Sequence, residues 1–266
     1  MPSSVKLNLY SVNMAAYNAA MSKNPNDSKV AAKRAPGKAT LPRAGRKNAA
    51  PKPGKTKAAG NASPYHHGAL RDALLEAAER VLERDGLAGL TLRAVAREAG
   101  VSHAAPTHHF GDLTGLVSEL AAIGFRQFSA AMASACDGSM PPMEQARIRA
   151  HAYVHYAQAH PGLYGLMFRT ERLDMSRPSL HEAANASFAG FAGTIGASRH
   201  EPISAQALTL DQGAALVRAW SLVHGFTMLL LDDRLSDVLR RLPEGIEVDT
   251  LLDAMLKSSI GRPPGA

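Results

Sequence analysis

Apolar residues recur at helical intervals along most of the chain. In the segment after residue 64, Leu70, Leu74, Ala77 and Val81 follow one another at spacings of three and four residues, which places them on one face of an α-helix. Later segments keep this period, and no run of alternating apolar and polar residues indicates a β-strand. The pattern therefore predicts an all-α protein.

Glycine, proline or N-capping residues separate the expected helices. The helices cover residues 70–84, 92–99, 103–110, 113–135, 143–159, 163–168, 179–197, 205–231 and 248–259. The second and third are short, whereas most of the later ones are long. We therefore expect a small helical domain over residues 64–112 and a larger helical domain over residues 113–260, preceded by a tail over residues 1–63.

The two short helices have the spacing of a helix-turn-helix. Thr91 is expected to cap the first, and Ser102 is expected to cap the second. The link between them reads Ala-Gly-Val-Ser, and its glycine, Gly100, can adopt the left-handed backbone that such a turn needs. A helix-turn-helix lays its second helix in the major groove of DNA, so this motif predicts DNA binding.

Exposed positions of the motif are the candidate DNA contacts. Thr91 and Ser102 lie at helix N-termini, where free backbone N–H groups favour a phosphate, and they can serve as caps at the same time. Arg93 can contact a phosphate or a guanine edge, and Ala105 suits a thymine methyl group. The full set of candidate DNA-binding residues is Thr91, Arg93, Ser102, His103, Ala104, Ala105, Thr107, His108 and His109.

Charge is spread unevenly over the 266 residues, whose formal net charge is +7. Residues 1–63 hold 12 Lys/Arg and one acid, a net charge of +11, so the rest of the chain carries −4. Lys, Ala, Pro, Gly and Asn dominate residues 22–63, and this composition predicts disorder. The tail is interpreted as a salt-sensitive arm on DNA phosphates. The alternatives are a solvated linker, or a start codon placed too early, with Met14 or Met21 as other starts.

A single cysteine, Cys136, excludes intramolecular disulfides and cysteine-rich zinc sites and fits a reducing compartment. No run reaches the ~18 apolar residues of a membrane span. The first 30 residues lack the apolar block of a secretory signal. We therefore expect a soluble cytoplasmic protein that does not associate with membranes.

Catalytic and metal chemistry find little support in the sequence. The sequence shows neither a nucleophile with an accompanying base nor a pair of carboxylates in the pattern of an active site. His151 and His155 share one helix face, a spacing that can hold a metal. No carboxylate or cysteine joins them at a helical spacing, and Tyr153 and Tyr156 indicate ordinary packing. We therefore predict no catalytic residue, no metal and no cofactor.

Aromatic and methionine side chains in the second half of the chain suggest a ligand pocket. Together with one histidine they suit an apolar ligand that has one hydrogen-bonding group. The alternative is that they simply form core. The candidate ligand-binding residues are Tyr164, Met167, Phe168, Trp220, His224 and Met228.

Several of these segments resemble a known family. Residues 65–71 (YHHGALR), 90–96 (LTLRAVA) and 100–110 (GVSHAAPTHHF) resemble the DNA-binding domain of the TetR/AcrR family of transcriptional regulators. Residues 160–168 (HPGLYGLMF) and 220–225 (WSLVHG) resemble the C-terminal ligand-binding domain of the branch named for its Trp-His-Gly signature. The resemblance covers roughly residues 64–260.

This resemblance implies a homodimeric regulator, usually a repressor, that binds a palindromic operator and is released by a small apolar effector. It also implies a dimer interface built from the helix near residues 205–231 and the last helix. The expected interface residues are Leu216, Leu222, Leu229, Leu252, Met255 and Leu256.

Three features depart from the family pattern. Thr107 stands where the family usually has tyrosine, and Leu113 stands where it usually has lysine. Between Pro64 and Leu113 the chain has five arginines and seven acidic residues, which give a net charge of −2. These features leave open a second class, a small-molecule binding or interaction protein with degenerate operator recognition.

Overall fold

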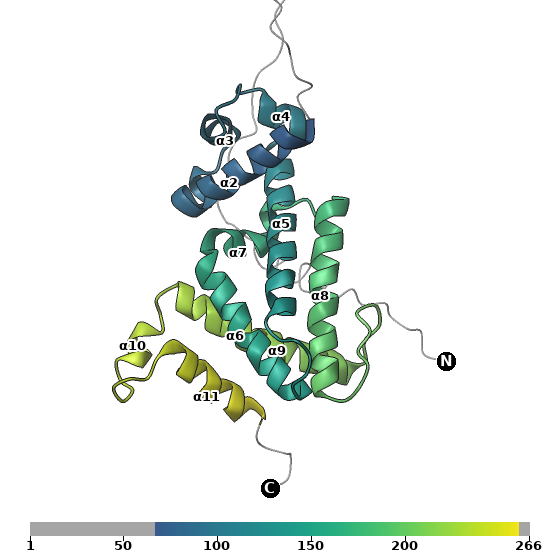
Figure 1. The fold of residues 1–266 in the computed structure, drawn as a ribbon, viewed down its shortest axis with the longest axis vertical. Helices are drawn as coiled ribbons and strands as arrows, with labels where there is room; N and C mark the ends of the chain where they lie inside the picture. The colour runs from purple at the N-terminus through teal and green to yellow at the C-terminus, as the bar shows by residue number, and fades with distance from the viewer. Residues whose placement is uncertain (1–66, 261–266) are drawn as a thin grey trace, which may run out of the picture.

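The computed structural model describes residues 67–260, and this part of the chain is built from helices (Figure 1). Its one β contact is an isolated bridge between Ser204 and Ala207. The prediction of an all-α protein is confirmed.

Three helices form a small unit at one end of the molecule (Figure 1). They are α2 (His67–Gly89), α3 (Leu92–Glu98) and α4 (Ala105–Phe110). Leu74 and Val81 of α2 are buried with Val95 of α3 and Phe110 of α4, which fixes the short helices against the long one. Gly86 interrupts α2 with a φ of 68°, at the position where the sequence predicts the first helix to stop.

The remaining helices form a larger bundle. In chain order they are α5 (Leu113–Ser134), α6 (Pro142–Ala159), α7 (Pro161–Met167), the 3-10 helix η1 (Thr170–Arg172), α8 (Pro178–Ser198), α9 (Leu210–Leu231), α10 (Ser236–Leu239) and α11 (Val248–Ile260). Helix α5 starts beside α4 and runs down into the bundle, where it lies beside α8 (Figure 1). One continuous hydrophobic core joins the two parts of the molecule.

The third expected helix begins two residues later than predicted. Ala104 caps α4, and the Ala105 N–H bonds to the Ser102 carbonyl at 3.0 Å, so Ser102 is not the N-cap. A helix that began at residue 103 would place Pro106 where a backbone N–H should bond to Ser102, and proline has no such donor. Pro106 is instead accommodated in the first turn of the shorter helix.

The long helix predicted over residues 205–231 also begins later, at Leu210. The Thr209 hydroxyl accepts the Gln212 N–H at 3.2 Å, and the Gln212 side chain accepts the Thr209 N–H at 3.1 Å. This capping box fixes the start of α9. Among the described helices, α9 alone has the length and composition of a membrane span. Buried helices of soluble proteins meet the same criterion, so this is weak evidence for a membrane.

Candidate DNA-binding surface and ligand cavity

The turn between α3 and α4 has the geometry of a helix-turn-helix. Gly100 has a φ of 68°, and the Val101 N–H bonds to the Ala96 carbonyl at 3.0 Å. At the other end of α3, the Thr91 hydroxyl accepts the Ala94 N–H at 3.1 Å. Thr91 is therefore the N-cap that the sequence predicts, and Gly100 supplies the left-handed turn.

The predicted DNA-binding residues are mostly exposed. Ala105 and His109 are half-buried, and Pro106 and Phe110 turn the opposite side of α4 into the core. The exposed members of the set are Thr91, Arg93, Ser102, His103, Ala104, Thr107 and His108. Most of the predicted set can therefore reach a DNA groove or backbone.

Three of the five arginines in this unit are already paired with carboxylates. Arg71 lies 2.7 Å from Glu119, and both Arg80 and Arg84 bind Glu98. Arg93 is exposed and forms no salt bridge within residues 67–260. The small unit thus presents little unpaired positive charge of its own.

Two polar links tie the small unit to the bundle. The Arg177 guanidinium, at the start of α8, donates to the Phe110 carbonyl at 3.2 Å and lies 3.6 Å from Glu119. The Glu83 carboxylate of α2 accepts the N–H groups of Gly162 and Leu163 at 3.0 and 2.9 Å, at the N-terminus of α7. Side-chain-to-backbone hydrogen bonds therefore attach both α4 and α2 to the bundle.

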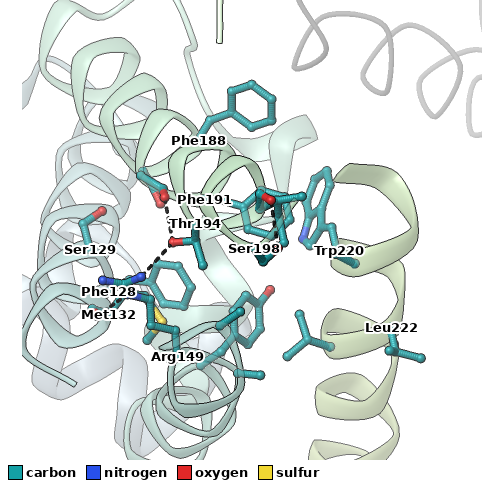
Figure 2. A pocket seen from close by; sticks show the side chains of 18 of the residues that line it. Phe128, Ser129, Met132, Arg149, Phe188, Phe191, Thr194, Ser198, Trp220 and Leu222 are labelled. Atoms are coloured by element: carbon teal, nitrogen blue, oxygen red, sulfur yellow. Dashed lines mark hydrogen bonds between the residues drawn. The ribbon is translucent and has the colours of Figure 1, made fainter. Parts of the chain in front are cut away.

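A cavity of about 570 Å³ lies inside the bundle, between α5, α6, α8, α9 and α11. Figure 2 shows aromatic side chains around it. Prominent apolar lining residues are Phe125, Phe128, Phe188, Phe191, Trp220 and Leu256. A cavity of this size and composition suits a small, largely apolar molecule.

Polar side chains line the cavity on several helices, including Ser129 of α5, Arg147 and Arg149 of α6, Thr194 of α8 and Arg218 of α9. Arg149 donates to the Thr194 hydroxyl at 3.3 Å (Figure 2) and to the Met132 carbonyl at 3.4 Å. The Ser129 hydroxyl is buried and has no hydrogen-bond partner among the described residues. No carboxylate side chain lines the cavity, and none within residues 67–260 forms a salt bridge with Arg149.

The six predicted ligand-binding residues separate into distinct places. Phe168 and Trp220 line the cavity, as predicted. Tyr164 and Met167 are fully buried in the core and do not line it. His224 lies next to Trp220 and Phe168 but is not a lining residue. Met228 is 38% exposed and does not line the cavity.

Two tyrosine hydroxyls lie against His224, and one of these tyrosines, Tyr153, lines the cavity. The Tyr164 hydroxyl lies 2.7 Å from His224 Nδ1, and the Tyr153 hydroxyl lies 3.0 Å from the same nitrogen. Burial raises the pKa of Tyr153 to about 12 and lowers the pKa of His224. The phenols therefore keep their protons, and the neutral imidazole accepts a hydrogen bond at Nδ1.

The predicted interface residues lie in different environments within the single chain. Leu216 and Leu252 are buried within the single chain, and Leu222 and Leu256 line the cavity. Met255 is half-buried, and Leu229 is 45% exposed. Helix α9 is apolar on more than one side, and the sequence alone does not tell which side faces the core.

Sequence reasoning missed the polar part of the cavity and most of α8. Arg149 has the appearance of a surface residue in the sequence, and Phe188 and Phe191 lie in an Ala- and Gly-rich helix without a recognisable motif. It also missed that Asp249 of α11 brings a carboxylate to His151 and His155, with ligand atoms within 4.8 Å of one another.

The chain matches two family models. Residues 74–120 match the model described as bacterial regulatory proteins, tetR family, and residues 147–258 match the model described as tetracyclin repressor-like, C-terminal domain. A search of the curated proteins finds no match to this chain.

Solved structures have the same architecture. A protein with unknown function from Rhodococcus sp. RHA1 is 34% identical, with a TM-score of 0.59 over 73% of this chain and 95% of that one. The regulatory protein SCO4313 is 20% identical, with a TM-score of 0.56 over 74% and 97% of the two chains. A tetR family transcription regulator from Shewanella sp. PV-4 is 17% identical, with a TM-score of 0.48 over 71% and 97%.

Proposed function

Because the chain belongs to the TetR family of transcription regulators, we propose that it is a repressor that binds a palindromic operator as a homodimer and is released by a small molecule. The observation that carries this proposal is the course of α5. The helix begins directly after α4 and then contributes Phe125 and Phe128 to the cavity. One rigid element therefore links the DNA-reading helix to the ligand.

Ligand binding acts on DNA affinity through the position of this element. A ligand that binds one arrangement of α5 more tightly than another shifts the population toward it, with a coupling of typically ~1–3 kcal/mol. The recognition helices of the dimer then lose the separation that successive major grooves require. The protein works in the cytoplasm, where its operator lies, and it carries out no catalysis.

A second copy of the chain is the partner that we propose for α9. Leu210, Val217 and Met228 share one face of this helix and are 92%, 47% and 38% exposed. Leu229 is also exposed, at 45%, and lies about 100° further round the helix. A face of this kind on a soluble protein marks an interface, and self-association of the same face gives a symmetric dimer. The proposed interface includes Leu229 and Met255, which the sequence also predicted, together with Val217 and Met228.

The effector that fits the cavity is a largely apolar molecule with one anionic group. Arg149 brings a positive charge to an aromatic cavity without a neutralising carboxylate, and Ser129 adds an unused hydroxyl. A carboxylate of the ligand can accept hydrogen bonds from both. A charge-assisted bond of this kind contributes about 1.5–3 kcal/mol.

Trp220 allows this effector class to be tested directly, because it is the only tryptophan in the chain and lines the cavity. Dodecanoate should change its fluorescence at lower concentrations than dodecanol. Arg149→Gln should weaken dodecanoate binding about 10- to 100-fold and leave dodecanol binding unchanged. Equal affinities for the acid and the alcohol would contradict an anionic effector.

Operator binding is tested by a gel shift of the full chain on its own upstream intergenic DNA at physiological salt. Sequence-specific retention should survive an excess of unrelated DNA and be lost in Thr107→Ala or Arg93→Ala. Arg240→Ala, an exposed change at the residue that follows α10, is the matched control. Retention on all DNA alike would favour the alternative, a small-molecule binding protein with degenerate operator recognition.

A further inference from the structure

We infer that α6 and α11 together form a binding site for a divalent transition-metal ion, zinc by the type of its ligands, in which His151, His155 and Asp249 supply the metal ligands. The inference is independent of operator and effector binding. It differs from the sequence-based expectation of no metal, which considered only partners at a helical spacing from the two histidines. The carboxylate comes instead from a helix about 100 residues later, since 94 positions separate His155 and Asp249.

The ligand atoms of the three side chains lie within 4.8 Å of one another, and both histidines already lie close to Asp249. His155 Nε2 lies 3.0 and 3.1 Å from the two carboxylate oxygens of Asp249. His151 Nδ1 lies 3.5 Å from Asp249 Oδ1. In a tetrahedral zinc site with bonds of about 2.0–2.1 Å, neighbouring ligand atoms are about 3.3 Å apart. Both His–Asp separations are therefore already close to this value, and side-chain rotations that bring the two imidazoles toward each other would complete the site.

A second carboxylate selects the histidine atom that faces the ion. His151 Nε2 lies 2.7 Å from Asp253 Oδ1, one helical turn after Asp249. With Nε2 as the donor to Asp253, the lone pair of His151 is on Nδ1, the nitrogen that faces Asp249. A carboxylate that orients a metal-bound histidine in this way is typical of zinc sites.

Asp253 is itself fixed from the other side. Arg147 Nη1 donates to the same Asp253 oxygen at 2.7 Å, and Arg147 also binds Glu144. The guanidinium thus balances the charge of Asp253 and leaves the Asp249 carboxylate to the ion. The two aspartates therefore have different roles: Asp249 is a metal ligand, and Asp253 orients His151.

Access and solvent also suit a metal site. The side chains of His155 and Asp249 are 55% and 53% exposed, whereas the His151 side chain is 16% exposed. An ion can therefore reach the site from solvent, and a water molecule can complete four-coordination. The bound ion would fasten α11 to α6, the helices that carry the cavity residues Leu256 and Arg149.

Calorimetric zinc titration of the full chain after chelator treatment tests the site. His155→Gln and Asp249→Asn should each remove the tightest binding event, and Asp253→Asn should weaken it about 10- to 100-fold. His181→Gln is the matched control, because His181 is exposed on α8 and pairs with Asn185 rather than with a carboxylate. Circular dichroism of each variant confirms that it is folded.

Cobalt(II) gives a readout that a purely structural ion-pair network would not produce. The wild-type chain and His181→Gln should develop the visible absorption of a tetrahedral cobalt site, and His155→Gln and Asp249→Asn should not. Zinc should raise the melting temperature only in the chains that bind it. Zinc affinity in Asp249→Asn equal to that of the wild type, or no tetrahedral cobalt spectrum in the wild type, overturns the site and leaves a His–Asp network that holds α11.

Discussion

The Arg177 guanidinium donates a 3.2 Å hydrogen bond to the carbonyl of Phe110, the last residue of α4. Arg177 precedes α8, which supplies Phe188 and Phe191 to the cavity wall. The contact therefore joins the end of α4 to a helix that lines the cavity. It runs beside α5 and gives the cavity a second connection to the DNA-reading surface.

Replacing Arg177 by methionine should weaken the coupling between effector and operator. The variant leaves the Phe110 carbonyl without this donor, at a cost to the free energy of unfolding of about 1–3 kcal/mol. Operator affinity measured with and without effector should differ less in the variant than in the wild type. Arg172→Met, an exposed change in η1, is the control, and an unchanged effector response in Arg177→Met would remove this contact from the mechanism.

Gly100→Ala should destabilise the helix-turn-helix. Its φ of 68° is a left-handed conformation that costs a residue with a Cβ atom about 1–2 kcal/mol. No heavy atom lies within 4 Å of the added Cβ, so the loss comes from the backbone alone. Gly193→Ala in α8 also meets no neighbour but has a helical backbone, and it should stabilise the chain by about 0.5–1 kcal/mol. Thermal denaturation of both variants measures the contrast.

Helix positions and the DNA-reading turn were predictable because they depend on local signals. The apolar period, the Thr91 cap and the left-handed Gly100 act within a few residues of sequence. Pro106 carried a local signal as well, since its missing N–H excludes the helix start that was predicted at residue 103. The helix boundaries thus follow from rules that a single sequence contains.

The interior of the bundle was less predictable, because it depends on which faces of distant helices meet. Met228 and Met167 are the same type of residue, but the first is 38% exposed and the second is fully buried in the core. Arg149 becomes a cavity residue only when α6 packs against α5 and α8. Asp249 reaches His155 only when α11 folds back on α6. No local pattern encodes these long-range contacts.

Val217→Glu should dissociate the homodimer. Val217 is 47% exposed on the apolar face of α9, and two copies of a charge at a symmetric interface would repel each other and lose solvent. Sedimentation analysis should show a shift from dimer to monomer. Val238→Glu, on α10 and 42% exposed, is the control. A dimer that persists in Val217→Glu would place the interface on another face.

His224 should make the bundle sensitive to acid. Burial lowers its pKa in the folded chain below the ordinary value, which is about 6.5 in the unfolded chain. Above about pH 6.5 His224 is neutral in both states and does not lower the free energy of unfolding. As the pH falls from about 6.5 toward the folded pKa, protonation favours the unfolded chain and the free energy of unfolding decreases. Chemical denaturation at pH 8 and pH 5.5 should show a smaller loss in His224→Gln than in the wild type. An identical loss in both chains would mean that other groups cause the acid sensitivity.

Deleting residues 1–63, which lie outside the described residues, should weaken operator binding and flatten its salt dependence. Residues 64–113 have a net charge of −2 and have three of their five arginines in ion pairs, whereas the tail carries +11. Each phosphate that the tail neutralises contributes about −0.9 to the slope of log K against log salt. Gel shifts of the full and shortened chains at several salt concentrations measure both slopes. If the tail is only a linker, the slopes will agree, and the affinity must then come from Arg93, the helix N-termini and the exposed histidines.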